Sequence, residues 1–188
     1  MAKARAITGL DAQAPVAANA RLIAKARLED LYLWEQAVDD PNNIRGLHDM
    51  RIAAKRLRYT FEVFEDVLPA ASQSIVSELT RLQDELGELH DSDVMIALLR
   101  MCLAKQNGGS TTGAQPSSHN GKALVPADMA AHLLDPAASP TAEQRGGLEE
   151  SMRQQEDLRA QRYTAFRQHW QQLQARDFRR QILDTLGV

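Results

Sequence analysis

The spacing of apolar residues between positions 75 and 89 constrains the fold of this chain more than any other feature. Intervals of four, three, four and three residues separate Ile75, Leu79, Leu82, Leu86 and Leu89. This spacing places the five side chains along one stripe of an α-helix, as in helices that pack in bundles. No segment shows the alternating pattern of a strand bounded by turn residues. The sequence therefore predicts an all-α protein, an antiparallel bundle of about four long helices.

Turn-forming residues divide the chain into its predicted segments. We expect a flexible tail over residues 1–17 and a single bundle over residues 18–188, with a long flexible connection at about 106–140. Thr141 and Gln144 form a predicted capping box, and Asp91 and Asp93 are expected to order the start of the apolar run 94–99. The first expected helix covers about 19–38, and the second begins within 40–43 and ends near 69. The third runs from about 75 to 101, with a bend near 87 or a restart at 90–93. The fourth covers about 141–174.

Charge is distributed unevenly along the chain. The formal net charge is −3, yet residues 45–58 contain five Arg or Lys residues and a single Asp. Such a local excess of positive charge indicates a confined anion site. The single Cys102 excludes an internal disulfide, and no Cys/His cluster has zinc spacing. The longest apolar run, 94–99, is too short for a signal peptide or a membrane span, so we expect a cytoplasmic protein without membrane contact.

The segment 47–64, LHDMRIAAKRLRYTFEVF, combines a basic stripe with an apolar face. At about 100° per residue, His48, Arg51, Lys55 and Arg58 project into a sector roughly 80° wide. Apolar residues fill a second sector, so one face is expected to pack on a core while Arg51 and Arg58 are exposed. A solvated face is the ordinary interpretation of such a stripe, but nearby acidic residues are sparse and only Glu62 can pair with Arg58. Because Arg side chains bind phosphate oxygens in pairs, the stripe is a candidate phosphate site.

Two His-Asp dipeptides, at 48–49 and 90–91, raise the alternative of an HD-like metal-dependent phosphohydrolase. Neighbouring residues on a helix diverge by about 100°, however, and the cations around His48 would repel a divalent ion. No glycine-rich phosphate loop follows a strand, and no nucleophile can be matched to a base. We therefore expect no catalytic residue, no metal and no cofactor. A helical interaction module for an acidic partner or nucleic acid is a further alternative, although only Tyr59 lies beside the stripe to stack a base.

The segments 47–64 and 82–99, LHDMRIAAKRLRYTFEVF and LQDELGELHDSDVMIALL, together resemble the paired signature of the CHAD family of histidine-containing α-helical domains. The resemblance rests on the order and spacing of His48, Arg51, Lys55, Arg58 and Tyr59. It implies non-enzymatic binding of inorganic polyphosphate, with direct phosphate contact by the first four of these residues. It also implies a domain that sits on polyphosphate granules or brings a partner enzyme to them.

The resemblance covers only one of the two helical halves that family members typically contain around a basic channel, and this copy is similar to the second half. It therefore implies either an open groove or two chains that pair as a homodimer. From helix phase we add Arg21, Lys25, Arg159 and Arg162 to the candidate polyphosphate ligands. Arg81 is a further candidate, although acidic neighbours on its own helix lie near enough to occupy it.

Overall fold

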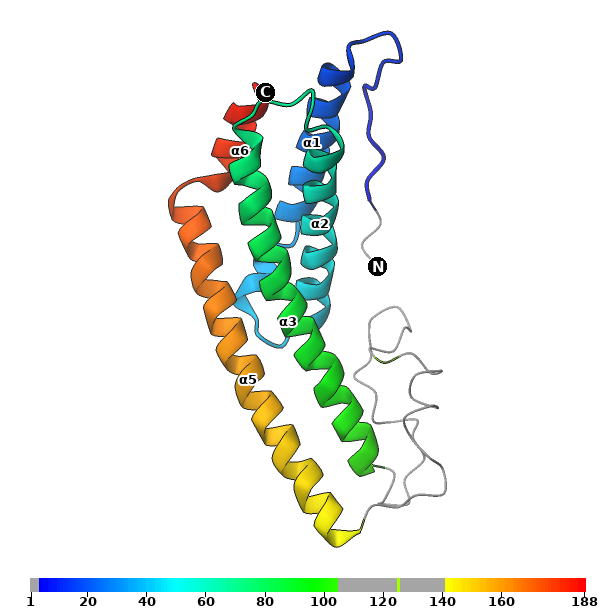
Figure 1. Cartoon of the computed structure of the whole chain (residues 1–188), viewed down its shortest axis with the longest axis vertical. Helices are drawn as coiled ribbons and strands as arrows, with labels where there is room; N and C mark the ends of the chain where they lie inside the picture. The colour runs from blue at the N-terminus through cyan, green and yellow to red at the C-terminus, as the bar shows by residue number, and fades with distance from the viewer. Residues whose placement is uncertain (1–3, 105–124, 126–140) are drawn as a thin grey trace. The chain divides into compact units, whose positions relative to one another are not determined.

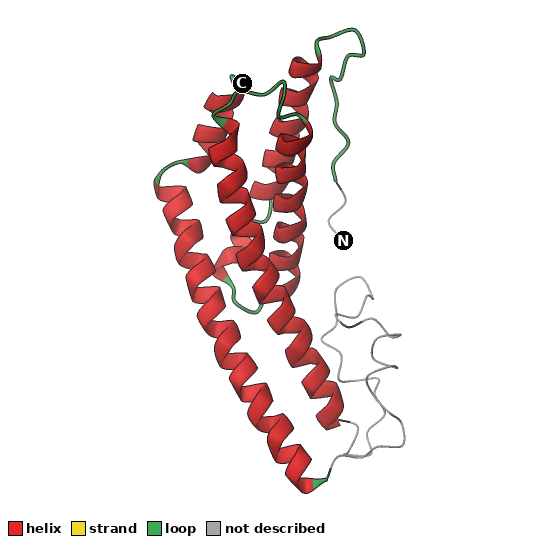
Figure 2. Ribbon diagram, viewed as in Figure 1, coloured by secondary structure: helices red, strands yellow, loops and turns green. Residues whose placement is uncertain are grey.

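The structure is a computed structural model that describes residues 4–104, 125 and 141–188. These described residues form helices and connecting segments without strands (Figure 2), and the helices pack against each other, so the predicted all-α class is confirmed. The elements are α1 (Val16–Tyr32), the 3₁₀ helix η1 (Glu35–Asp39), α2 (Ile44–Val63), α3 (Ser72–Ala104), α5 (Ala142–Ala175) and α6 (Phe178–Leu186). Except for Val125, the predicted connection at 106–140 lies outside the described residues.

The chain divides into two compact units. The first comprises Met1–Gly87 and Tyr163–Val188, and the second comprises Glu88–Arg162. Helices α3 and α5 contribute residues to both units. The sequence analysis did not predict two units, although it allowed a bend of the third helix near residue 87, where the two units divide.

Helices α1, α2 and the first part of α3 lie side by side in the first unit (Figure 1), and the end of α5 and α6 also contribute fully buried side chains to its core. Both α1 and α2 bury alanines, including Ala20 and Ala24 on α1 and Ala53 and Ala54 on α2, and such small side chains let two helices approach closely. All five residues of the predicted stripe along α3 are at most 2% exposed, so that prediction is confirmed. The apolar face of α2 is also confirmed: its members are buried except Phe64, which lies just past the helix end and is half-buried.

The connection between α1 and α2 differs from the prediction of one helix over 19–38. Helix α1 ends at Tyr32, and η1 follows it, burying Ala37 and Val38. This 3₁₀ helix comes so close to the start of α2 that a Cβ atom on Gly46 would lie 2.5 Å from the Cβ of Ala37. Asn43 caps α2, within the predicted range 40–43, because its Oδ1 accepts a hydrogen bond from the Gly46 amide at 2.9 Å.

The later helices confirm some predicted boundaries and correct others. Helix α2 ends at Val63 instead of near 69, and turns fill residues 64–67. Helix α3 continues without a restart, so Asp91 and Asp93 lie inside it and cap nothing. The predicted capping box is present: the Thr141 amide donates to Gln144 Oε1 at 2.8 Å, and the Gln144 amide donates to Thr141 Oγ1 at 3.3 Å. The short helix α6 was not predicted.

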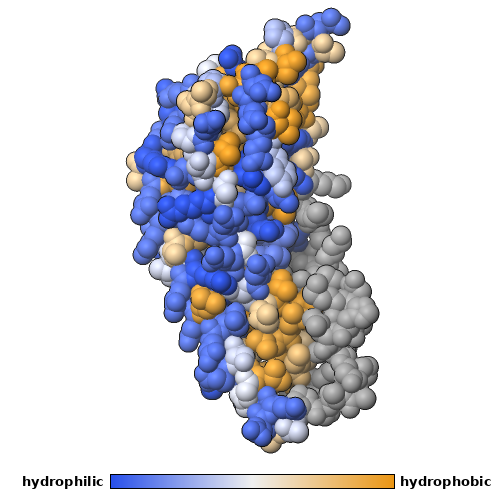
Figure 3. All heavy atoms as spheres, viewed as in Figure 1, coloured by the Kyte–Doolittle hydropathy of each residue, from blue (hydrophilic) through white to orange (hydrophobic). Residues whose placement is uncertain are grey.

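Polar side chains predominate on the face of the described residues that Figure 3 shows, with apolar side chains gathered in a few places. In the part of the chain that the structure describes, no helix has the length and apolar character that crossing a membrane requires. In the second unit, Ala97 and Val125 are buried, and Val94, Leu98 and Met101 pack against them.

We predict that Leu57→Ala destabilises the first unit, because Leu57 is fully buried in the apolar face of α2. Removing a buried leucine side chain costs roughly 2 to 5 kcal/mol. Chemical unfolding of the parent and the variant measures the loss. Val63→Ala is the matched control, because Val63 lies on the same helix but is 75% exposed. Similar losses in the two variants would mean that the helix faces are assigned wrongly.

Candidate functional site

Four of the predicted phosphate ligands follow one flank of α2: His48, Arg51, Lys55 and Arg58, which we call the basic row. A rise of 1.5 Å per residue spreads them over about 15 Å of the helix. All four are half-buried, so Arg51 and Arg58 are less exposed than predicted. The reason is that this flank of α2 lies against α3, where Gln83 and Gly87 approach it.

Arg58 contacts three side chains. Its Nη1 donates to Glu62 Oε1 at 2.5 Å, one helical turn along α2, which confirms the predicted pair. Its Nε donates to Gln83 Oε1 on α3 at 3.0 Å. The guanidinium carbon also lies 4.7 Å from the ring centroid of Tyr59, within cation–π distance. These contacts fix the position of the Arg58 head.

Arg51 and Lys55 have a different environment. The Nε of Arg51 is buried and has no hydrogen-bond partner among the described residues. It lies where α3 has Gly87, and a Cβ atom on that glycine would be 3.6 Å from it. Lys55 Nζ lies 5.4 Å from the Tyr59 ring centroid. Within residues 4–104, 125 and 141–188, neither cation has a carboxylate within ion-pair distance.

Arg21 and Lys25, which we added from helix phase, lie on α1, the helix that packs against α2. Both are half-buried. The Nε of Arg21 is buried without a hydrogen-bond partner among the residues described, as is that of Arg51. In the same part of the chain, neither Arg21 nor Lys25 forms an ion pair. The structure therefore places these two cations in the same unit as the basic row.

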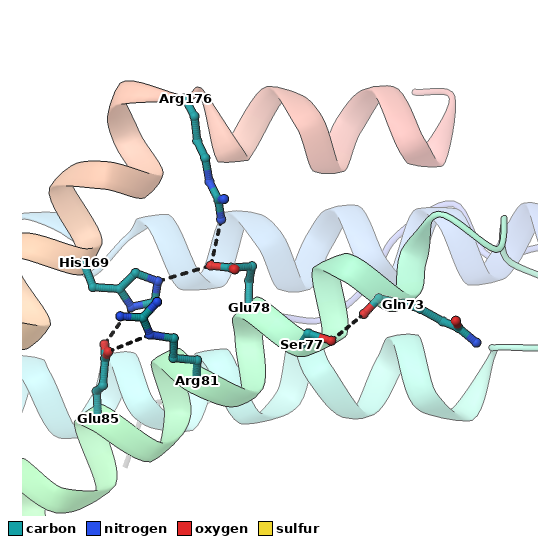
Figure 4. A network of polar contacts seen from close by, with 7 residues as sticks. All are labelled: Gln73, Ser77, Glu78, Arg81, Glu85, His169 and Arg176. Atoms are coloured by element: carbon teal, nitrogen blue, oxygen red, sulfur yellow. Dashed lines mark hydrogen bonds and ion pairs between the residues drawn. The ribbon is translucent and has the colours of Figure 1, made fainter.

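Arg81 belongs instead to a network of charges between α3 and α5 (Figure 4). Its Nε lies 3.1 Å from Glu85 Oε1, and Glu85 Oε2 lies 2.7 Å from Nδ1 of His169 on α5. The other ring nitrogen of His169 lies 3.2 Å from Glu78 Oε2, which Arg176 also contacts at 2.7 Å. Arg81 thus directs its head toward α5, whereas its neighbour Gln83 contacts α2. The sequence analysis predicted that an acidic neighbour on the same helix would pair with Arg81, and Glu85 does so.

His169 is a residue that the sequence analysis missed. It is 3% exposed and has a carboxylate oxygen at each ring nitrogen. Because an ionised carboxylate only accepts hydrogen bonds, each of these contacts is a hydrogen bond only where the ring nitrogen that faces it carries a hydrogen. Burial alone raises the pKa of Glu78, but the hydrogen bond from His169 and the charge of Arg176 lower it below its ordinary value of 4.5. The only signal in the sequence was that position 169 lies within the apolar spacing of α5, next to Trp170.

Arg159 and Arg162 lie in the second unit, where α3 provides partners for both. Arg159 pairs with Asp93, and Arg162 donates from Nη1 to Ser92 Oγ at 2.7 Å. The Nε of Arg162 lies 3.2 Å from Glu88 Oε2. Burial raises the pKa of Asp93 more than its contacts with Arg159 lower it. Both arginines therefore stabilise the contact between α3 and α5 within this unit, a role that the sequence analysis did not assign to them.

The His-Asp dipeptides do not assemble a metal site within the described residues, where no group of three or more His, Cys, Asp and Glu side chains is placed to hold an ion. Asp49 is buried, 3.7 Å from Nε of Arg45, while His48 lies on the basic row. In the second unit Asp91 is exposed on α3.

Comparison with known protein families shows which family this chain belongs to. The family model of the CHAD domain matches residues 3–100, just over half of the 188-residue chain, and the chain belongs to the CHAD family. CHAD domains are associated with polyphosphate-related proteins. The matched span includes the basic row, Arg21, Lys25 and Arg81, whereas Arg159 and Arg162 lie beyond it. No curated protein and no solved structure matches the chain.

We predict that Gly87→Ala stabilises the protein without displacing Arg51. Glycine inside a helix costs about 1 kcal/mol relative to alanine, and the added Cβ would make an ordinary van der Waals contact with Arg51 Nε. Thermal unfolding should show a higher midpoint. A lower midpoint would show that α3 and Arg51 have no room for the methyl group.

A second prediction concerns acid. Because the pKa of Glu78 is lower in the folded chain, its contribution to stability is present above about pH 4.5 and is lost as the pH falls below that value. Glu78→Gln should therefore lower the free energy of unfolding at pH 7, and its difference from the parent should shrink below about pH 4.5. Urea unfolding between pH 7 and 3.5 tests this. Glu65→Gln, at an exposed position, is the control. If the difference in free energy of unfolding between Glu78→Gln and the parent does not change with pH, the prediction is wrong.

Proposed function

We propose that the chain is a non-enzymatic domain that binds inorganic polyphosphate along the basic row. The observation that carries the proposal is the state of Arg51, whose Nε is buried without a hydrogen-bond partner among the described residues. A buried N–H group without a partner costs free energy, and the positive charge of the half-buried guanidinium attracts an anion. Lys55, one turn further along α2, likewise has no carboxylate partner in the part of the chain described. Family membership supports phosphate as the anion.

The length of the row favours a chain of phosphates over a single phosphate. Its four side chains lie 4.5 to 6 Å apart by helical rise, over about 15 Å in total, and an extended polyanion can contact them one after another. Arg21 and Lys25 on α1 are the next candidates in the same unit. We assign no primary role to Arg81, whose head points toward α5, or to Arg159 and Arg162, which lie in the second unit.

The contacts of Tyr59 favour polyphosphate over single-stranded nucleic acid. Proteins that bind single strands stack bases on exposed aromatic rings. Tyr59 is 45% exposed, but its ring is within cation–π distance of both Lys55 and Arg58. We therefore expect long polyphosphate to bind more tightly than DNA of equal phosphate charge. Titrations with the two ligands compare their affinities directly. Phosphate release from polyphosphate in the presence of manganese or magnesium would instead support the alternative of a phosphohydrolase.

We predict that Arg51→Gln lowers the affinity for long polyphosphate at least about tenfold, since a hydrogen bond to a charged group contributes about 1.5 to 3 kcal/mol. The loss of one phosphate contact should also reduce the slope of log affinity against log salt by about 0.7. Calorimetry at several salt concentrations measures both quantities.

The matched control is Arg56→Gln, which removes the same charge from α2 but from a position outside the row. Equal losses in the two variants would mean that the net charge of the helix, and not the row, governs binding.

The pairing of two chains as a homodimer stays a prediction, and the mass of the protein in solution with and without polyphosphate tests it.

A further inference from the structure

Within the basic row, Arg58 differs from Arg51 and Lys55 in having its own counter-ion. Glu62 contacts Nη1 of Arg58, Gln83 accepts from Nε, and the ring of Tyr59 lies beside the guanidinium. The side chain of Arg58 is 18% exposed, whereas that of Glu62 is 37% exposed. The carboxylate therefore lies on the solvent side of the pair, where a polyanion would approach.

We propose that Glu62 regulates the basic row by competing with the polyanion for Arg58. This inference rests on the proposed function. A guanidinium binds a phosphate most strongly through two parallel N–H groups. In Arg58, Nη1 already donates a hydrogen bond to Glu62. A phosphate that binds the Arg58 guanidinium must therefore displace the Glu62 carboxylate or bind only the remaining N–H groups. In the second case the phosphate lies beside the negative charge of Glu62. Both outcomes weaken binding at this end of the row.

The surroundings of Arg58 allow the exchange. Glu62 is joined to α2 by a flexible side chain and can rotate into solvent, because Arg58 is its only ion-pair partner among the described residues. Gln83 is neutral and can continue to hold Nε while the anion changes. The head of Arg58 thus stays in place while its counter-ion is exchanged. A polyanion anchored at Arg51 and Lys55 would be held near Arg58 at a high effective concentration, which helps it to displace Glu62.

The test compares Glu62→Gln with the parent, using calorimetric titration with long-chain inorganic polyphosphate as the ligand. The variant keeps the length of the side chain and removes its charge. We expect tighter binding by about two- to fivefold, the range that a partly exposed ion pair of this kind supports. Glu65→Gln is the matched control, because it removes the same charge from an exposed position three residues further along, where the described residues offer no cation within ion-pair distance.

The same two substitutions are then made in an Arg58→Gln background. If Glu62 acts through Arg58, Glu62→Gln should tighten binding there no more than Glu65→Gln does. Equal tightening in both backgrounds would show a general charge effect and overturn the proposal, as would a Glu62→Gln variant that binds like the control. In both of these cases the parent still binds polyphosphate and the proposed function stands. If the parent does not bind polyphosphate, the function and this inference fall together.

Discussion

The packing of α2 against α1 is the constraint on which the candidate site depends. The apolar face of α2 can be buried in only one rotational setting, and alanines on both helices bring the two backbones close together. Once that setting is fixed, residues one position further along the helix must lie on the neighbouring flank. The basic row consists of such residues, and this is why it lies against α3 instead of facing water freely.

Helix α3 presents different chemistry to its two neighbours in the first unit. Toward α5 it presents the carboxylates of Glu78 and Glu85, which meet His169 (Figure 4). Toward α2 it presents Gln83 and Gly87, which carry no charge. Among the described residues, α3 therefore places no carboxylate within ion-pair distance of Arg51, Lys55 or Arg58, and Arg58 pairs with Glu62 of α2 itself. A negative residue at position 83 or 87 would instead lie close enough to pair with Arg58 or Arg51.

The same residue type has opposite roles in different parts of this chain. Arg159 and Arg162 follow helical spacing as regular as that of Arg51 and Arg58, yet α3 supplies an acidic partner for each within the second unit. Arg81 is likewise taken by Glu85. Spacing along one helix indicates only that a set of charges shares a face. Whether those charges remain available is decided by what the neighbouring helix places opposite them, and for Arg51 that is a glycine.

The sequence by itself determined the helical class, the buried stripe along α3, the capping box at Thr141 and the common flank of the basic row, because each depends on periodicity or on residues within four positions of one another. It did not determine the break after Tyr32, the cap at Asn43, helix α6 or the division into two units. Those features depend on contacts between residues far apart in the chain, such as Ala37 against Gly46 or His169 between Glu78 and Glu85. Tertiary structure also decided which arginines have an acidic partner on another helix, because that depends on the side chains that a neighbouring helix brings within hydrogen-bonding distance.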